Sequence, residues 1–197
     1  MIGPPAAGVR PWLALAGLLA AGSVLAWALP AAALDWQPAL ALAEPWRAWT
    51  AAFVHWSALH LGANLLGTLV VAALGWAAPA PPRAAWAWAA AWPLTQWGLL
   101  VRPELAHFGG LSGVLHAGVA VVVVDLVAAA RGRRRALGVA IGLGLLTKIV
   151  LEAPWGPTLR HGDGWDIAVA PLAHATGALA GLLCGGLALA WRRQSAR

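Results

Sequence analysis

Residues 107–118 read HFGGLSGVLHAG, and residues 119–130 continue as VAVVVVDLVAAA. The second stretch is apolar except for Asp125, and together with the residues before it, it approaches the roughly 20 apolar residues that a helix needs to cross a bilayer. The first stretch places Ser112 among four glycines and between two histidines, where that helix begins. Polar groups at membrane depth are costly, so this serine calls for a role in packing or in chemistry.

The composition as a whole is that of a membrane protein. The chain has 197 residues, of which 61% are hydrophobic and 10% charged, and its mean hydropathy is +0.73. A soluble domain of this length cannot bury so much apolar surface. We therefore expect an all-α, polytopic membrane protein, with residues 1–197 forming one bundle of six transmembrane helices. The predicted spans are about residues 12–29, 56–77, 84–101, 110–130, 136–151 and 171–191.

The cations predict the orientation of these spans. If the N-terminus is cytoplasmic, the inner segments hold nine arginines: Arg10, Arg83, Arg131, Arg133, Arg134, Arg135, Arg192, Arg193 and Arg197. The outer segments hold Arg47, Arg102 and Arg160, and Lys148 lies within the fifth span. Since cytoplasmic loops carry the excess of Lys and Arg, both termini are expected in the cytoplasm. The orientation of the chain in a membrane therefore accounts for the net charge of +6. The expected partner is the lipid bilayer, and no nucleic-acid partner is expected.

The first span has an alternative interpretation. Arg10, the apolar stretch after it and the small residues of PAAAL at 30–34 also resemble a cleavable signal peptide. Cleavage would leave five spans and would not change the orientation of the others.

Ser112 and His174 are the candidate nucleophile and base. His174 lies in PLAHATGALAGLLCG, residues 171–185, about one turn into the sixth predicted span. Gly177 and Gly181 follow on the same helix and would let another helix come close. If spans four and six touch, His174 can take the serine proton as a general base. The alternatives are a serine that caps its helix and a histidine that binds an interfacial loop.

A third polar group lies in HWSALHLGANLLG, residues 55–67. His60 and Asn64 are four residues apart, so both side chains project from one helix face. An imidazole and an amide together could donate hydrogen bonds to a carbonyl oxygen that is becoming an oxyanion. The alternative is a polar pair that joins two helices.

Taken in order, these motifs resemble those of the rhomboid family of intramembrane serine proteases. The similarity covers residues 45–182: WR at 46–47 is similar to the family's first-loop pair, HLGAN at 60–64 matches HxxxN, GLSG at 110–113 matches GxSG, and AHATGALAG at 173–181 matches AHxxGxxxG. Each motif alone is common, whereas their ordered combination is specific. The six predicted spans agree with the basic core of this family.

The resemblance implies a Ser112–His174 dyad without a carboxylate, and neither a metal nor a cofactor. It also implies an oxyanion hole made by His60, Asn64 and the backbone N–H of Ser112. No Asp or Glu adjoins His174 in the sequence, and Asp125 would lie about 20 Å deeper at about 1.5 Å per residue. The implied site opens to water on the periplasmic side of a bacterial inner membrane, and the implied substrates are transmembrane proteins.

One departure from the family lies beside the serine. The chain has no tyrosine, and His116 stands one turn after Ser112, where many rhomboids carry a tyrosine stacked on the catalytic histidine. We expect His116 to pack against His174 or to hydrogen-bond with it. Further supporting residues are expected around the site: His55, Gly110 and Gly113.

Lys148 and Glu152 are a second departure. They are four residues apart on the fifth span, and an unpaired lysine is costly in a membrane, so we expect an ion pair. The small size, GLSGVLH and this K-x-x-x-E spacing resemble the rhombosortase branch of the family. That resemblance implies substrates with a C-terminal GlyGly-containing motif, an apolar helix and a basic tail.

Other functions remain open at this point. The chain could be a general rhomboid protease with other single-span substrates, or an inactive relative that binds transmembrane helices. It could also be a structural bundle, or a metal site or transporter built from His55, His60, His107, His116 and His174. The histidine spacing lacks a compact metal-ligand motif, and a metal site would leave Ser112 and Asn64 without a role.

Overall fold

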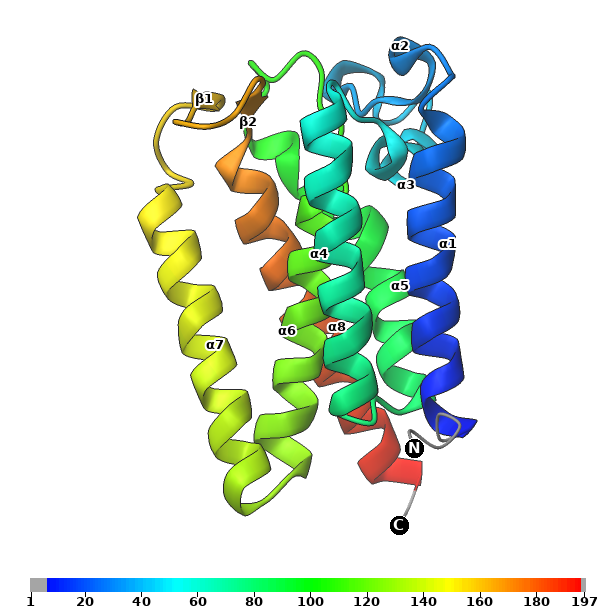
Figure 1. Cartoon of the computed structure of the whole chain (residues 1–197), viewed down its shortest axis with the longest axis vertical. Coiled ribbons are helices and arrows are strands. Elements are labelled where there is room, and N and C mark those ends of the chain that lie inside the picture. The colour runs from blue at the N-terminus through cyan, green and yellow to red at the C-terminus, as the bar shows by residue number, and fades with distance from the viewer. Residues whose placement is uncertain (1–6, 196–197) are drawn as a thin grey trace.

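The computed structural model describes residues 7–195 and places a helix over each of the six predicted spans. The helices are α1 (Arg10–Ala26), α4 (Ala58–Ala77), α5 (Pro82–Trp97), α6 (Ser112–Ala129), α7 (Gly132–Glu152) and α8 (Pro171–Ser195). Figure 1 shows them side by side in one bundle, with the start of α1 and the end of α8 at the same end. Helices α4, α6 and α8 are long and apolar enough to cross a membrane, and α1 is a shorter apolar helix.

The helix limits differ from the predicted spans where turn residues intervene. Helix α5 ends at Trp97, and a 3-10 helix, Gly98–Val101, continues to the predicted limit. Helix α7 begins at Gly132, so the arginines at 133–135 form its first turn. Of the cations expected on the cytoplasmic side, Arg197 lies outside the described residues.

The longer connections gather at one end of the bundle. The segment between α1 and α4 contains α2 (Ala31–Leu34), α3 (Arg47–Thr50) and the 3-10 helices Pro38–Leu40 and Ala51–Phe53. The segment between α7 and α8 contains β1 (Arg160–His161) and β2 (Ala168–Val169), which pair antiparallel. We call this the loop end (Figure 1), and we call the opposite end, where α7 begins, the arginine end.

Helices α6 and α8 approach each other through small residues. A methyl group added at Gly177 would collide with the carbonyl oxygen of Gly113, and one at Gly181 would collide with that of Ala117. A Cβ on Gly113 would lie 2.7 Å from the carbonyl oxygen of Ala173. No side chain therefore separates the two backbones near the start of either helix, and this brings the first turns of α6 and α8 together.

Two tryptophans fix the other helices around this pair. The indole of Trp12 on α1 donates a hydrogen bond to the Val71 carbonyl of α4 at 3.0 Å. The indole of Trp88 on α5 donates to the Val114 carbonyl of α6 at 2.8 Å. The two rings are 4.4 Å apart and both side chains are fully buried. Polar contacts of this kind hold helices together where lipid offers no hydrophobic driving force.

The packing predicts that leucine substitutions at two glycines of α8 differ sharply in their effect on stability. Gly177→Leu forces α6 and α8 apart, and we expect the free energy of unfolding to fall by about 1–3 kcal/mol or more because overpacking strains the contact. Gly186→Leu is the matched control, since nothing lies within 4 Å of a Cβ at that position. Thermal unfolding in detergent micelles measures both variants. Equal Tm values for the two would contradict the packing described here.

Candidate active site

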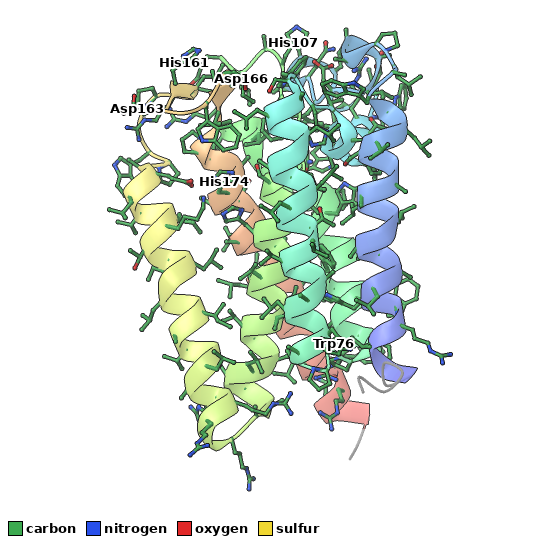
Figure 2. The ribbon with its side chains drawn as sticks, viewed as in Figure 1. Trp76, His107, His161, Asp163, Asp166 and His174 are labelled. Atoms are coloured by element: carbon green, nitrogen blue, oxygen red, sulfur yellow. The ribbon has the colours of Figure 1, made fainter. Side chains whose placement is uncertain are left out.

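The site begins where α6 and α8 meet near the loop end. Ser112 is the first residue of α6, and His174 lies one turn into α8. Ser112 Oγ is 2.9 Å from His174 Nε2, within hydrogen-bond distance. In Figure 2, His174 lies deeper in the bundle than His107, His161, Asp163 and Asp166, and Trp76 lies towards the arginine end. The pair expected from the sequence is therefore brought together below the loop end.

Two cavities meet at this pair. One, of about 200 Å³, lies near the loop end and is lined by His60, His107, Ser112 and His174 among others. The other, of about 750 Å³, lies between α4 and α7 and also reaches His60, Ser112 and His174. Its walls are largely apolar, with Leu66 and Val70 from α4 and Ile141 from α7. The hydroxyl and the imidazole can thus be reached both from the loop end and from the side of the bundle.

His60 and Asn64 supply hydrogen-bond donors beside Ser112. His60 Nδ1 accepts a hydrogen bond from the Trp56 backbone N–H at 3.4 Å, which leaves the proton on Nε2. Asn64 Nδ2 is buried, and no residue that the structure describes accepts a hydrogen bond from it. Buried amide donors are rarely left unsatisfied, so Asn64 has a donor free for a group that enters the site.

Gly110, which lies just before α6, has a backbone conformation that requires glycine. Gly110 has a φ of +138°, and a Cβ there would lie 2.9 Å from His60 Nε2. Its N–H donates to the Ala51 carbonyl at 2.9 Å. Only glycine adopts this backbone without strain while leaving room for the imidazole. Gly110 therefore leaves space for the His60 imidazole beside the start of α6.

The structure stacks His116 on His174. The two rings are 4.2 Å apart with an interplanar angle of 12°, and His116 Nδ1 donates to the Ser112 carbonyl at 2.7 Å. His116 thus packs against His174, the first of the two contacts expected of it. His55 contacts His60, with 4.8 Å between the ring centroids, and its Nδ1 donates to the Phe53 carbonyl at 3.1 Å. Burial lowers the pKa of His55, so this ring is neutral near pH 7.

The expectation that no carboxylate lies beside His174 is wrong. Glu152 Oε2 is 2.6 Å from His174 Nδ1, and Lys148 forms the expected ion pair with the other oxygen of Glu152. Glu152 is the last residue of α7, and its side chain reaches the first turns of α8. A contact across 22 residues of chain has no signature in the local sequence. Asp125, as expected, does not serve His174, since it pairs with Arg83 at 2.6 Å.

The chain is similar to a known protein family over most of its length. A family model described as the Rhomboid domain matches residues 42–191. The chain belongs to the rhomboid family. Members of this family are membrane-embedded serine proteases that act on membrane-protein substrates within the lipid bilayer. No curated protein matches the chain.

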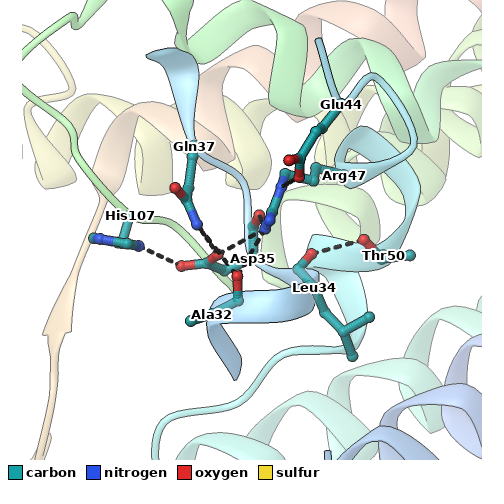
Figure 3. Close-up of polar contacts among 8 residues, drawn as sticks. All are labelled: Ala32, Leu34, Asp35, Gln37, Glu44, Arg47, Thr50 and His107. Atoms are coloured by element: carbon teal, nitrogen blue, oxygen red, sulfur yellow. Dashed lines mark hydrogen bonds and ion pairs between the residues drawn. The ribbon is translucent and has the colours of Figure 1, made fainter. Parts of the chain in front are cut away.

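The loop end of this rhomboid is held by a buried ion pair (Figure 3). The Arg47 guanidinium is 3.1 Å from the Asp35 carboxylate, which is fully buried, and it also donates to the Asp35 carbonyl at 2.9 Å. His107 and Gln37 bind the same carboxylate, at 2.6 and 2.8 Å. Trp36, next to Asp35, exchanges two backbone hydrogen bonds with Phe108. Arg47 of the WR pair, acting through Asp35 and its neighbour Trp36, thus fixes the segment that leads into Ser112.

Asp35 is a second residue near the site, besides Glu152, whose contacts the sequence reasoning missed. The available signal was a carboxylate in the same connection as the Trp-Arg pair, because a buried arginine needs an anionic partner. His107, one of the histidines considered for an alternative metal site, lines the smaller cavity but directs Nδ1 at Asp35. Within residues 7–195, no three His, Cys, Asp or Glu side chains converge as metal ligands.

The buried pair gives a prediction for stability. Arg47→Ala leaves the Asp35 carboxylate buried without its cation, and we expect the free energy of unfolding to fall by about 3–5 kcal/mol. Arg133→Ala, at an exposed position in the first turn of α7, is the matched control and should change stability little. Chemical unfolding followed by tryptophan fluorescence measures both. A smaller loss for Arg47→Ala than for Arg133→Ala would show that the cluster does not hold this end of the protein.

Proposed function

We propose that this rhomboid is an intramembrane serine endopeptidase in which Ser112 is the nucleophile and His174 the general base. The observation that carries the proposal is the 2.9 Å separation of Ser112 Oγ and His174 Nε2 at the junction of two cavities. A nucleophile within hydrogen-bond reach of a base is the arrangement that activates serine. The free Asn64 donor in the same cavity supports an acyl-transfer reaction rather than a role in helix binding alone.

In the first half of the reaction, Ser112 Oγ attacks the carbonyl carbon of the substrate and His174 Nε2 accepts the hydroxyl proton. The carbonyl oxygen becomes an oxyanion, and the donors offered to it are Asn64 Nδ2, His60 Nε2–H and the Ser112 backbone N–H. The positive end of the α6 dipole favours the same charge. His174 then gives its proton to the leaving amine nitrogen as the C–N bond breaks, and an acyl-enzyme remains.

In the second half, water attacks the acyl-enzyme. The smaller cavity is its route, since it joins the loop end to Ser112 and His174. His174 takes a proton from the water as it attacks and returns it to Ser112 Oγ when the ester breaks. The new carboxyl group leaves on the shortened substrate, and the enzyme is restored.

We further propose that all six long helices cross a bacterial inner membrane with the arginine end in the cytoplasm. Arg10, Arg83, Arg131 and the arginines at 133–135 belong to the starts of α1, α5 and α7, which lie at that end. The positive-inside bias then places both termini in the cytoplasm and the loop end in the periplasm. The active site faces the periplasm and lies within the membrane.

The proposed substrates are membrane-anchored proteins with a C-terminal GlyGly-containing sorting tail, cleaved as by a rhombosortase. A helical substrate hides its carbonyls, so the segment to be cleaved must unwind near Ser112. Glycine lowers that cost, because each glycine destabilises a helix by about 1 kcal/mol relative to alanine. Single-span substrates without a GlyGly tail are the alternative, and they would enter the same cavity between α4 and α7.

Removal of the Ser112 hydroxyl tests the nucleophile. When the protein is co-expressed with a reporter that carries a GlyGly-containing tail, Ser112→Ala should abolish cleavage. The mass of the product's C-terminus locates the cut. Ser23→Ala is the matched control, since Ser23 is a buried serine of α1 that binds the Leu19 carbonyl. Full cleavage by Ser112→Ala would end the serine-protease proposal. Cleavage of tail-free reporters at an equal rate would favour the alternative substrates.

Removal of the Asn64 amide tests the oxyanion contact. Asn64→Ala removes one donor and should lower kcat by about 10²–10³-fold with little change in KM, because the hydrogen bond forms fully only with the developing charge. Thr68→Val serves as the control, one turn deeper on α4, where the threonine hydroxyl binds the Asn64 carbonyl. Steady-state kinetics on a purified reporter measure both. A rise in KM at unchanged kcat would assign Asn64 to substrate binding instead.

A further inference from the structure

The hydrogen-bonded chain at the site does not stop at His174. Glu152 Oε2 lies 2.6 Å from His174 Nδ1, and Lys148, one turn earlier on α7, binds Oε1 of the same carboxylate. Of the residues that the structure describes, Glu152 is the one carboxylate hydrogen-bonded to this imidazole. The side chains of Ser112, His174, Glu152 and Lys148 thus form one continuous sequence of contacts across α6, α8 and α7.

We propose that Glu152 is a positioning residue for His174, and that Lys148 holds Glu152 in place as its counter-ion. The inference rests on the proposed protease function and deepens it. The site would then operate as a Ser-His-Glu triad in which the carboxylate comes from α7.

The chemistry of the three groups supports this assignment. An ionised carboxylate only accepts hydrogen bonds, so the contact with Glu152 places the His174 proton on Nδ1. The lone pair of Nε2 then faces Ser112 Oγ, which is the tautomer that a general base needs. When the serine proton arrives, the ring becomes an imidazolium, and a carboxylate at hydrogen-bond distance stabilises that charge.

The other ionisable groups around His174 do not offer this contact. His60 faces the site from α4, and its Nδ1 binds the Trp56 backbone. His116 stacks on His174 from α6, and its Nδ1 donates to the Ser112 carbonyl. Lys148 lies on α7 with Glu152 and balances its charge. The negative charge beside Nδ1 therefore comes from Glu152.

Helix α7 presents Glu152 through polar contacts made at the loop end. Gly138 is the one buried residue of α7, so apolar packing fixes this helix mainly near the arginine end. At the other end, Arg160 donates to the Glu152 carbonyl at 2.7 Å, and Arg102 donates to the Gly156 carbonyl at 2.9 Å. Thr158 binds Glu104, and this hydrogen bond lowers the pKa of the Glu104 carboxyl. These contacts hold the last turn of α7 beside His174.

The test compares Glu152→Gln and Lys148→Met with Asp163→Asn, which changes an exposed carboxylate in the segment that follows α7. The first readout is the rate at which a fluorophosphonate labels Ser112 in the full-length protein. The second is the pH dependence of that rate, and the third is the split between kcat and KM on the reporter. Tm values in detergent confirm that each variant is folded.

We expect Glu152→Gln to lower the labelling rate and kcat by about 10- to 10³-fold with KM unchanged. This is less than the about 10⁴-fold loss when asparagine replaces the triad aspartate in soluble serine proteases. The acid limb of the pH–rate profile should move to lower pH in Glu152→Gln, because the imidazolium loses its anion. It should move to higher pH in Lys148→Met, because the anion loses its counter-ion. Asp163→Asn should match the wild type.

A merely structural role would lower the rate at every pH without moving the acid limb, and this result would overturn the inference. A wild-type labelling rate in Glu152→Gln would also overturn it and would leave a working Ser112–His174 dyad. If Glu152→Gln does not fold, Lys148→Met provides the test. An acid limb of the pH–rate profile at higher pH supports the inference, and an acid limb that does not move rejects it. Failure of the protease proposal is separate, since it requires cleavage by Ser112→Ala.

Discussion

The close approach of α6 and α8 is the constraint on which the proposed chemistry depends. Gly113 and Gly177 remove the side chains that would separate the two backbones just below the loop end. Ser112 and His174 stand at the first turns of these helices and so come within 2.9 Å of each other. In a membrane, where apolar side chains gain little by leaving lipid, small residues at a helix contact supply the packing that a hydrophobic core supplies in water.

The rest of the bundle completes the site by bringing polar groups to this contact from other helices. Helix α4 contributes His60 and the Asn64 amide, and α7 contributes Glu152 with its lysine partner. The buried Asp35–Arg47 pair fixes the loop that leads into Ser112. Buried charges are costly unless they are paired, so the Asp35–Arg47 pair constrains the geometry of this end as well as satisfying individual atoms.

The sequence predicted the helices and the Ser112–His174 pair because apolar runs, small-residue spacing and cation placement are local signals. It also predicted the Lys148–Glu152 pair, since a spacing of four sets two side chains on one helix face. It missed the Glu152–His174 contact, because the approach of α7 to α8 depends on how the helices tilt in space. Asp35 was missed because its partner Arg47 is 12 residues away, across a connection whose path the local sequence does not specify.

The most direct measurement of the central claim is an experimental structure of the protein in a lipid nanodisc after reaction with a fluorophosphonate. We predict a phosphonyl group bonded to Ser112 Oγ, with the phosphonyl oxygen directed at Asn64 Nδ2 and His60 Nε2. The His174 imidazole should remain in contact with Ser112 Oγ. An unmodified Ser112, or a His174 turned towards lipid and away from α6, would contradict the account.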